Sequence, residues 1–314
     1  MDPLFLPNRA TSRPLRGCLK TAIAPALAWW AGSAAPLGQN LFGIITYHRV
    51  WTADRRFGRP TYNVSPRRLH EQLSGLLQRG YAAWPLGRVL DHCRRGIPVP
   101  RRTFVVTFDD GYANNLTEAL PVLQSLAIPA TIFLATGYLD SDEPFPFDSW
   151  TSKGDGRCRD AWAPLRADQC RTAVASGLIE LGCHTHTHQV FGDRPASFEE
   201  DLHKSLACLH REFGIDQPAF SFPFGIADGP LRDAARRSGV TCGLTTTPQL
   251  VPVASDPFSW GRFGVSESDS AASLSVKLNG WFDAARRVFT DGVGSLSFGK
   301  PATMVRMSRT EVQP

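Results

Sequence analysis

The sequence predicts a single α/β domain organised around a parallel sheet or barrel. The chain has 314 residues, a length that α/β barrels occupy as one unit. Its composition, 42% hydrophobic and 20% charged, is that of a globular protein. From about residue 41 onward, short apolar stretches alternate with stretches of helical periodicity. That alternation is typical of folds in which helices connect parallel strands.

The strands and helices are expected in a regular order. The strands share a short apolar core, and we place them at residues 41–47, 81–86, 103–108, 131–135, 179–183, 219–222 and 241–245. The helices between them carry apolar residues on one face, and their clearest starts are an N-cap at Ser65 followed by Pro66, and a capping box from Ser197 to Glu200. The strand at 103–108 is continuously apolar at its centre, which indicates burial on both faces. Residues 137–165, which contain several Pro and Gly, are interpreted as an excursion over the surface of the kind that often covers a site.

Both ends of the chain differ from this pattern. Residues 1–40 place four basic residues before an apolar run at 22–31 that contains two tryptophans. We interpret them as an amphipathic segment that packs on the fold or touches a membrane peripherally, with a cleaved signal peptide as the alternative. The barrel domain is expected at 41–289, with a last helix near 281–289, and residues 290–314 are expected to be a flexible tail.

Cysteine usage and charge exclude several classes of protein. The seven cysteines form no Cys-x-x-Cys pair, so neither a disulfide framework nor a thiolate zinc site is indicated. A reducing compartment is favoured, and we expect a cytoplasmic protein, peripheral at the inner membrane if the N-terminal segment binds there, with secretion as the alternative. The net charge of +5 is spread over short basic pairs, which does not predict nucleic-acid binding.

Two adjacent carboxylates follow the strand at 103–108. The chain there reads Thr-Phe-Asp-Asp-Gly, so Asp109 and Asp110 lie at the carboxyl end of a buried strand, where the active-site loops of a barrel converge. Adjacent carboxylates repel each other unless solvent, a helix N-terminus or a cation compensates. Taken alone, the pair is equally well explained as an N-cap and a solvated turn residue.

Three histidines follow the strand at 179–183. In a helical turn His184 and His188 share one face and His186 points away, which gives a two-histidine metal site. In an extended conformation all three share one face, and a three-histidine site becomes the competitor. Both conformations predict metal binding.

These motifs, followed by Phe-Ser-Phe-Pro-Phe-Gly at 220–225, resemble the polysaccharide deacetylase family, known also as carbohydrate esterase family 4 or the nodulation-protein-B homology domain. The resemblance covers roughly residues 41–265 and implies a distorted, incomplete (β/α)7 barrel. It also implies roles for the two acidic and two histidine positions. Asp109 matches the catalytic base, while Asp110, His184 and His188 match the ligands of a divalent metal, for which we expect Zn²⁺.

The third motif departs from the common family pattern. Ser221 stands where the common form has Arg. Arg262, in the sequence Trp-Gly-Arg, is expected to replace it, by similarity to an Arg in bacterial exopolysaccharide deacetylases. The resemblance further implies that the backbone N–H of Phe224 stabilises an oxyanion, and that Pro223, Arg262 and Trp260 belong to the substrate-binding region.

The source of the catalytic acid also differs. No histidine follows His210, so the usual C-terminal Leu-x-His motif is absent. Residues 46–50 read Thr-Tyr-His-Arg-Val and resemble the opening of poly-N-acetylglucosamine deacetylases, in which the acid histidine comes early. We therefore expect His48 to be the catalytic acid.

The sequence thus predicts a metal-dependent hydrolase that removes N-acetyl groups from an amino-sugar glycan and releases acetate. One alternative is an amidohydrolase or phosphohydrolase barrel that uses His184 and His186 as a ligand pair, although its later strands would lack further histidine ligands. The other is a glycan-binding protein that has kept the barrel and lost activity. Intact acidic and histidine motifs argue against it.

Overall fold

The computed structural model describes residues 40–53, 60–148 and 159–280. The predicted N-terminal segment, the helix expected at 281–289 and the tail expected at 290–314 lie outside these ranges. Within them, none of the helices combines the length and the apolar character that crossing a bilayer requires.

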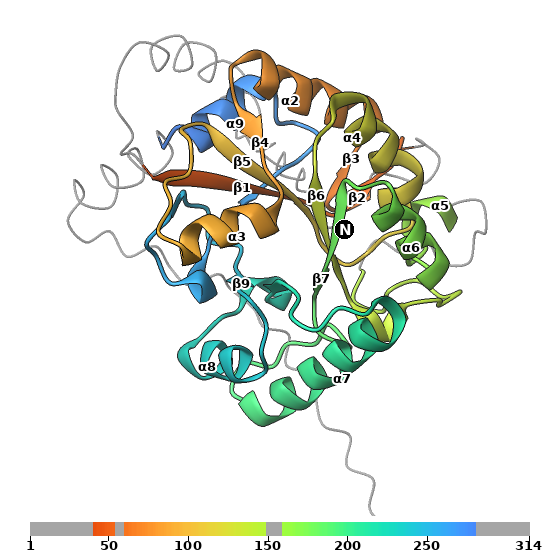
Figure 1. Cartoon of the computed structure of the whole chain (residues 1–314). Coiled ribbons are helices and arrows are strands. Elements are labelled where there is room, and N and C mark those ends of the chain that lie inside the picture. Colours follow the sequence, from red (N-terminus) through yellow and green to blue (C-terminus); the bar gives the residue numbers. More distant parts are fainter. Residues whose placement is uncertain (1–39, 54–59, 149–158, 281–314) are drawn as a thin grey trace, which may run out of the picture.

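A curved sheet of parallel strands forms the centre of the molecule (Figure 1). Its strands lie in the order β1 (Leu41–Tyr47), β5 (Thr103–Phe108), β6 (Ala130–Leu134), β7 (Ile179–Cys183), β8 (Phe220–Ser221) and β9 (Gly243–Leu244). A further strand, β11 (Phe263–Gly264), runs parallel to β1 on its other side. Between β9 and β11 the described residues form only one isolated parallel bridge, Leu244 to Trp260. The expected α/β fold is confirmed, and its parallel strands follow the order of an incomplete (β/α)7 barrel.

Short strands extend or flank this sheet. β4 (Ala82–Ala83) pairs with the start of β5, and β10 (Val251–Pro252) pairs antiparallel with the start of β1. β2 (Arg49–Val50) and β3 (Asn63–Val64) form a separate two-stranded sheet immediately after the end of β1.

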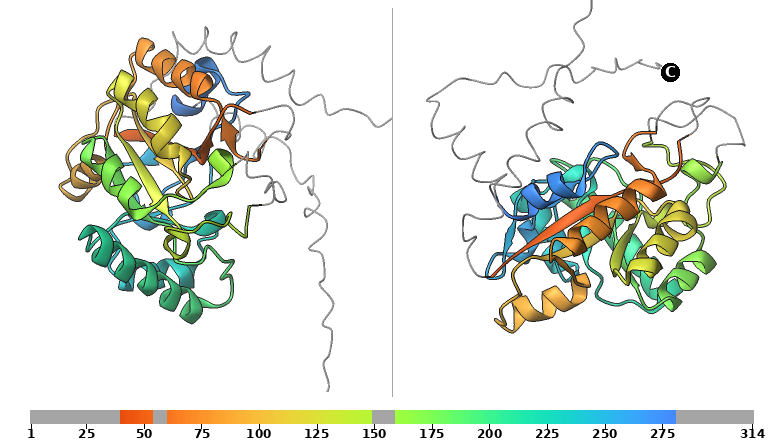
Figure 2. Two further views of the ribbon diagram at one scale, coloured as in Figure 1. Left: turned by 90° about the vertical axis from the view of Figure 1, so that its right-hand side faces the viewer. Right: turned by 90° about the horizontal axis from the view of Figure 1, so that it is seen from above.

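The helices lie around the outside of the strands (Figures 1 and 2). They are α2 (Pro66–Gln78), α3 (Leu86–Arg94), α4 (Leu120–Leu126), α5 (Arg159–Trp162), α6 (Ala167–Ala175), α7 (Pro195–Phe213), α8 (Gly229–Arg237) and α9 (Ala271–Leu278). Although they are far apart in sequence, α2 and α9 pack side by side. A Cβ on Gly43 of β1 would lie 2.1 Å from a methyl carbon of Leu278, so the glycine is what lets α9 approach the sheet.

Several predicted boundaries are confirmed and others are wrong. The strands at 41–47, 103–108 and 179–183 are confirmed, and Ser65 caps α2 by accepting a hydrogen bond from the backbone N–H of Arg68 at 3.3 Å. The strand predicted at 81–86 is reduced to β4, because Leu86 already begins α3. The capping box predicted at Ser197 is wrong, because α7 begins two residues earlier, at Pro195.

Along β1 and β5 the side chains alternate between two cores. Ile45 and Tyr47 belong to the larger core, which includes the leucines of α2 and α4. Phe42 and Ile44 belong to a second core that also contains Val105, Phe133, Leu244 and Trp260, from strands around the sheet. Because strand side chains alternate with a period of two, Thr46 continues the face of Phe42 and Ile44. The interior is therefore apolar at the amino ends of the strands and becomes polar toward their carboxyl ends.

Candidate metal centre and pocket

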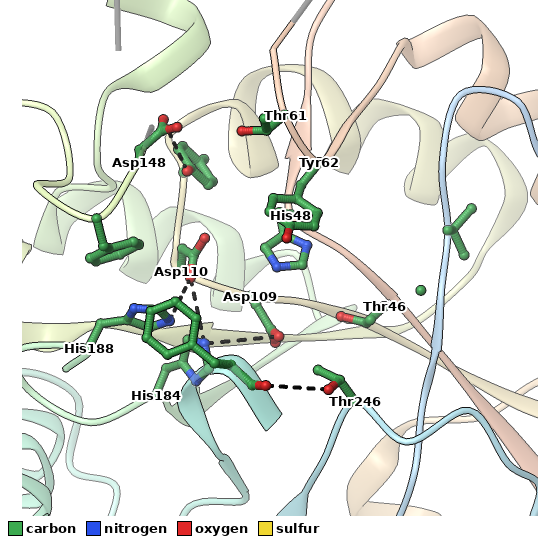
Figure 3. A pocket seen from close by; sticks show the side chains of 15 residues that line it. Thr46, His48, Thr61, Tyr62, Asp109, Asp110, Asp148, His184, His188 and Thr246 are labelled. Atoms are coloured by element: carbon green, nitrogen blue, oxygen red, sulfur yellow. Dashed lines mark hydrogen bonds and ion pairs between the residues drawn. The ribbon is translucent and has the colours of Figure 1, made fainter. Parts of the chain in front are cut away.

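A pocket of about 340 Å³ opens at the carboxyl ends of the parallel strands (Figure 3). His48 follows β1, Asp109 and Asp110 follow β5, and His184 and His188 follow β7. All five line the pocket, although they come from three strands that are distant in the chain. This placement agrees with the rule that a barrel's functional residues gather at the carboxyl ends of its strands.

Asp110, His184 and His188 form a compact ligand set in which one atom of each side chain lies within 4.8 Å of the others. The Asp110 Oδ1 atom is 3.5 Å from Nε2 of His184 and 3.5 Å from Nε2 of His188. His184 Nδ1 lies 2.7 Å from the backbone oxygen of Ser221. That contact fixes the ring so that Nε2 faces Asp110, as is common for metal-ligating histidines.

The donor set fits a divalent cation. Burial, followed by the charge of Asp109, raises the pKa of Asp110 well above its usual range, and within the described residues no donor hydrogen-bonds its carboxylate. Burial also lowers the pKa of His184. Burial and then the charge of His184 lower the pKa of His188 to about 2. The imidazoles are thus neutral, which is the form that ligates metal. A divalent cation would supply the positive counter-charge that an ionised Asp110 carboxylate needs.

His188 is held by aromatic rings. Within the described residues its Nδ1 has no hydrogen-bond partner. Its ring stacks on Phe147 with centroids 3.9 Å apart, and the ring of Phe224 meets it edge-on at 4.7 Å. These contacts leave Nε2 directed at Asp110.

The histidine segment has neither of the two conformations considered from the sequence. It is an irregular turn in which Thr185 (φ 64°) and His188 (φ 51°) have left-handed backbone. Asp201 of α7 holds the turn by accepting hydrogen bonds from the backbone N–H groups of His186 and Thr187 at 2.8 and 3.0 Å. The side chain of His186 turns away, with Nδ1 3.0 Å from the hydroxyl of Thr136. The turn therefore brings His184 and His188 together and leaves His186 outside the ligand set.

Asp109 faces a buried guanidinium. Arg262 donates to both oxygens of Asp109 at 2.7 Å, and also to the hydroxyl of Ser221 at 2.8 Å. Burial on its own would raise the pKa of Asp109, but the charges of Arg262 and His184 outweigh it and hold that pKa well below its usual range. Arg262 is 0% exposed and does not line the pocket. It thus contacts the carboxylate from behind, and the direct substrate contact expected for Arg262 is not supported.

His48 lies on the opposite side of the pocket from the histidine pair (Figure 3). Its ring stacks on Tyr62, with centroids 4.7 Å apart and planes inclined by 23°. Its backbone oxygen accepts a hydrogen bond from Asn115 at 2.7 Å. Burial lowers the pKa of His48 to about 4, although the charge of Asp109 opposes the change.

The segment after β8 places one expected residue at the pocket and buries another. Phe224 lines the pocket, is 51% exposed and has left-handed backbone (φ 58°). Pro223 is buried beside it. Gly225 (φ 71°) is required here, because a Cβ would lie 2.0 Å from the hydroxyl oxygen of Thr246.

The substrate-binding role expected for Trp260 is not supported. Its side chain is 1% exposed and packs edge-on against Phe42, with centroids 5.1 Å apart, in the apolar interior. It does not line the pocket. The physical reason is its place in the chain: Trp260 follows the short helical turn Pro257–Ser259, forms an isolated bridge to Leu244 and is buried in the apolar core that contains Phe42.

A buried cluster next to the candidate metal ligands was missed by the sequence interpretation. Arg49 pairs with Asp148, donates to the hydroxyl of Tyr112 at 2.8 Å and lies 4.4 Å from the centre of that ring. Asp148 and Tyr112 line the pocket. Asp148 comes from the excursion at 137–165, so the expectation that this excursion reaches a site agrees with the geometry. The available signal was the position of Arg49 directly after His48.

Comparisons with known proteins identify the same region. Residues 96–243 match the family described as polysaccharide deacetylase. That match contains Asp109, Asp110, His184 and His188, and leaves out His48 and Arg262.

Two curated relatives carry the name poly-beta-1,6-N-acetyl-D-glucosamine N-deacetylase. The protein from Escherichia coli (strain K12) is 32% identical over 153 residues, which cover 48% of this chain and 21% of that protein. The chain thus spans about a fifth of the length of this relative. The protein from Staphylococcus aureus (strain MSSA476) is 22% identical over 231 residues, which cover 71% of this chain and 74% of that protein.

A solved structure supports the fold. The structure of IcaB from Ammonifex degensii superposes with a TM-score of 0.63 and 24% sequence identity, covering 76% of this chain and 96% of that one. The two chains share the fold of the strands and helices that position the pocket.

Proposed function

We propose, on the premise that residues 96–243 match the polysaccharide deacetylase family, that the chain is a metal-dependent hydrolase that removes N-acetyl groups from an amino-sugar glycan. The single observation that carries the proposal is the convergence of two carboxylates in different environments on one pocket. Asp110 lies within a histidine ligand set, and Asp109 lies beside it on a guanidinium. The substrate class is that named for the relatives from Escherichia coli and Staphylococcus aureus.

We assign the metal to Asp110, His184 and His188, and propose Zn²⁺ or a similar borderline ion. One carboxylate and two imidazoles suit such an ion and leave coordination positions for water and substrate. A divalent ion held there would acidify water and polarise an amide carbonyl.

Asp109 is proposed as the general base. Its Oδ2 is 4.0 Å from Nε2 of His184, so it lies beside the ligand set. Arg262 keeps it ionised and fixes both oxygens, which leaves a carboxylate able to accept a proton from the attacking water. Arg262 acts as a positioning residue in this scheme. We propose that it replaces the Arg of the common family motif, because it hydrogen-bonds to Ser221, the residue that stands at that motif position.

His48 is proposed as the general acid. Water adds to the acetyl carbon, the C–N bond breaks, and the departing nitrogen takes a proton to leave as an amine, with acetate as the other product. Burial favours the neutral imidazole, so His48 has to be charged before it can donate. The negative charge of Asp109 across the pocket favours that protonation. The backbone N–H of Phe224, at the pocket wall, is proposed to stabilise the oxyanion.

The rival use of a His-x-His pair is not favoured. The side chain of His186 bonds to Thr136 and lies outside the ligand set. A non-catalytic glycan-binding role would leave unexplained why Asp109 is held ionised next to the ligands.

The test is acetate release from N-acetylglucosamine oligomers by the full-length protein, with and without a chelator. We expect release that the chelator abolishes and added Zn²⁺ restores. Asp109→Asn is the matched control for contaminating deacetylase. Release that persists in this variant, or no release by the parent with any divalent ion, would contradict the proposal.

A further inference from the structure

Tyr62 is an aromatic side chain in an unusual setting. It is 73% exposed, yet it lines the same pocket as the metal ligands. Its backbone is left-handed (φ 51°). Gly adopts this conformation freely and Asn and Asp tolerate it, whereas it is unfavourable for the other residues. A tyrosine at such a position costs stability without burying its ring, which is typical of residues whose strain serves a site.

The small sheet β2–β3 fixes the position of Tyr62. Arg49 pairs with Asn63, and the backbone N–H of Arg49 donates to the backbone oxygen of Tyr62 at 3.3 Å. The residue after His48 is therefore tied directly to Tyr62. The ladder carries the ring over the imidazole, where the two planes stack at 4.7 Å.

The two faces of the Tyr62 ring have different neighbours. One face covers His48, whose ring nitrogens make no hydrogen bond within the described residues, so stacking is the contact that fixes the imidazole plane. The rest of the ring is open to solvent at the rim of the pocket. An exposed aromatic face beside a pocket is the kind of surface on which the apolar C–H face of a pyranose ring can stack.

We propose that Tyr62 forms a saccharide-stacking subsite at the pocket rim and, through its inner face, positions the imidazole of His48. This inference rests on the proposed function for its choice of ligand, a β-linked N-acetylglucosamine oligomer. A sugar ring that stacks on Tyr62 lies next to His48. The binding of one sugar of the oligomer therefore orders the imidazole of His48, which would protonate the amine of the sugar that reacts.

The experiment compares the parent with Tyr62→Phe and Tyr62→Asn in the full-length, metal-loaded protein. Asn tolerates the left-handed backbone but removes the ring. Dissociation constants for an N-acetylglucosamine oligomer are measured by calorimetric titration in the Asp109→Asn background. We expect Tyr62→Asn to weaken binding about 3- to 10-fold, with an unchanged or higher melting temperature, and Tyr62→Phe to bind within about two-fold of the parent because its ring is intact.

Val174→Asn is the matched control, since Val174 is an exposed apolar residue of α6 that does not line the pocket. It should bind as the parent does. A second ring deletion, Tyr62→Gly, keeps the comparison valid if the Asn variant folds poorly, because glycine adopts this backbone freely.

Kinetics separate the positioning role from binding. In the otherwise unmodified chain, Tyr62→Asn should lower kcat for oligomer deacetylation more than kcat for a small activated acetyl ester, whose leaving group needs little protonation. Equal losses on both substrates would overturn the positioning role.

The outcomes distinguish the two proposals. Parent-like binding by both ring-deletion variants would overturn the subsite and leave the hydrolase proposal intact. Binding that depends on Tyr62, in a parent protein that releases no acetate, would support the subsite and overturn the hydrolase. A parent that binds no oligomer would overturn both.

Discussion

Asp109 and Asp110 are adjacent in the chain and both are buried, yet their surroundings are opposite. Asp109 is matched by a bidentate guanidinium, which holds its pKa low. Among the described residues, Asp110 faces two neutral imidazoles at 3.5 Å and no cation at that range, and its pKa is raised. Asp110 has left-handed backbone (φ 74°), and the two side chains meet different partners. The comparison teaches that the role of each carboxylate is set by the group it faces, and not by the doublet itself.

The largest expected effect comes from replacing each of the two carboxylates in turn. Asp109→Asn should retain the metal and lose about 10²–10⁴-fold in deacetylation rate, because an amide cannot accept the proton of water. Asp110→Asn should lose the metal. Metal analysis and acetate release on both variants provide the measurement. Metal loss in the first variant and retention in the second would reverse the two assignments.

The second prediction concerns the partner of Asp109. Arg262→Met should lower the free energy of unfolding by about 3–5 kcal/mol, because it leaves a buried carboxylate without its cation. Urea denaturation measures the change. The double variant Asp109→Asn/Arg262→Met should lose less than the sum of the single variants.

The control for Arg262 is an exposed ion pair. Arg67→Met removes one of the two arginine partners of Glu71 on the surface of α2 and should change the unfolding transition little. Equal losses in the two Arg variants would show that the Asp109 pair has no special energetic role.

The third prediction concerns His48, the proposed proton donor to the leaving amine. His48→Ala should bind metal normally and lose about 10²-fold in amide hydrolysis, with a smaller loss on an activated ester. Steady-state rates on both substrates give the ratio. Near-parental hydrolysis of an N-acetylated oligosaccharide would remove His48 from the mechanism.

The smallest expected effect concerns Asp201, which supports the turn that carries the candidate ligand His188. Asp201→Asn should weaken metal binding about 10–100-fold, because Asp201 holds the turn that carries His188. Competition with a chromogenic chelator measures the affinity. His186→Ala is the matched control, since its side chain faces Thr136, and it should bind metal as the parent does. Equal losses would restore a three-histidine site.

The strands that support the site could be predicted because their apolar cores are local signals. Continuous apolar runs at 103–108 and 179–183 mark buried strands, and the polar residues that follow them mark their carboxyl ends. The short strands β8 and β9 are defined mainly by their neighbours across the sheet. Their bounds could be predicted only approximately.

Within the site, ligand identity was more accessible than ligand geometry. The spacing of His184 and His188 indicated a shared metal, but the turn between them depends on Asp201, which comes from a later helix. Tyr62 and Asp148 carry no motif and reach the pocket through tertiary structure alone. Trp260 carries no local signal of its burial, because the core that surrounds it is built by strands from other parts of the chain.

Because β1 pairs with β11, the site is completed only when the last part of the fold has been synthesised. Arg262 reaches Asp109 across 153 residues of sequence, and the strand that directly follows it, β11, pairs with the first strand of the fold. A nascent chain therefore contains Asp109, Asp110 and both ligand histidines well before the guanidinium has left the ribosome. A message cut short before codon 262 would encode every residue of the ligand set together with a buried carboxylate that has no counter-charge.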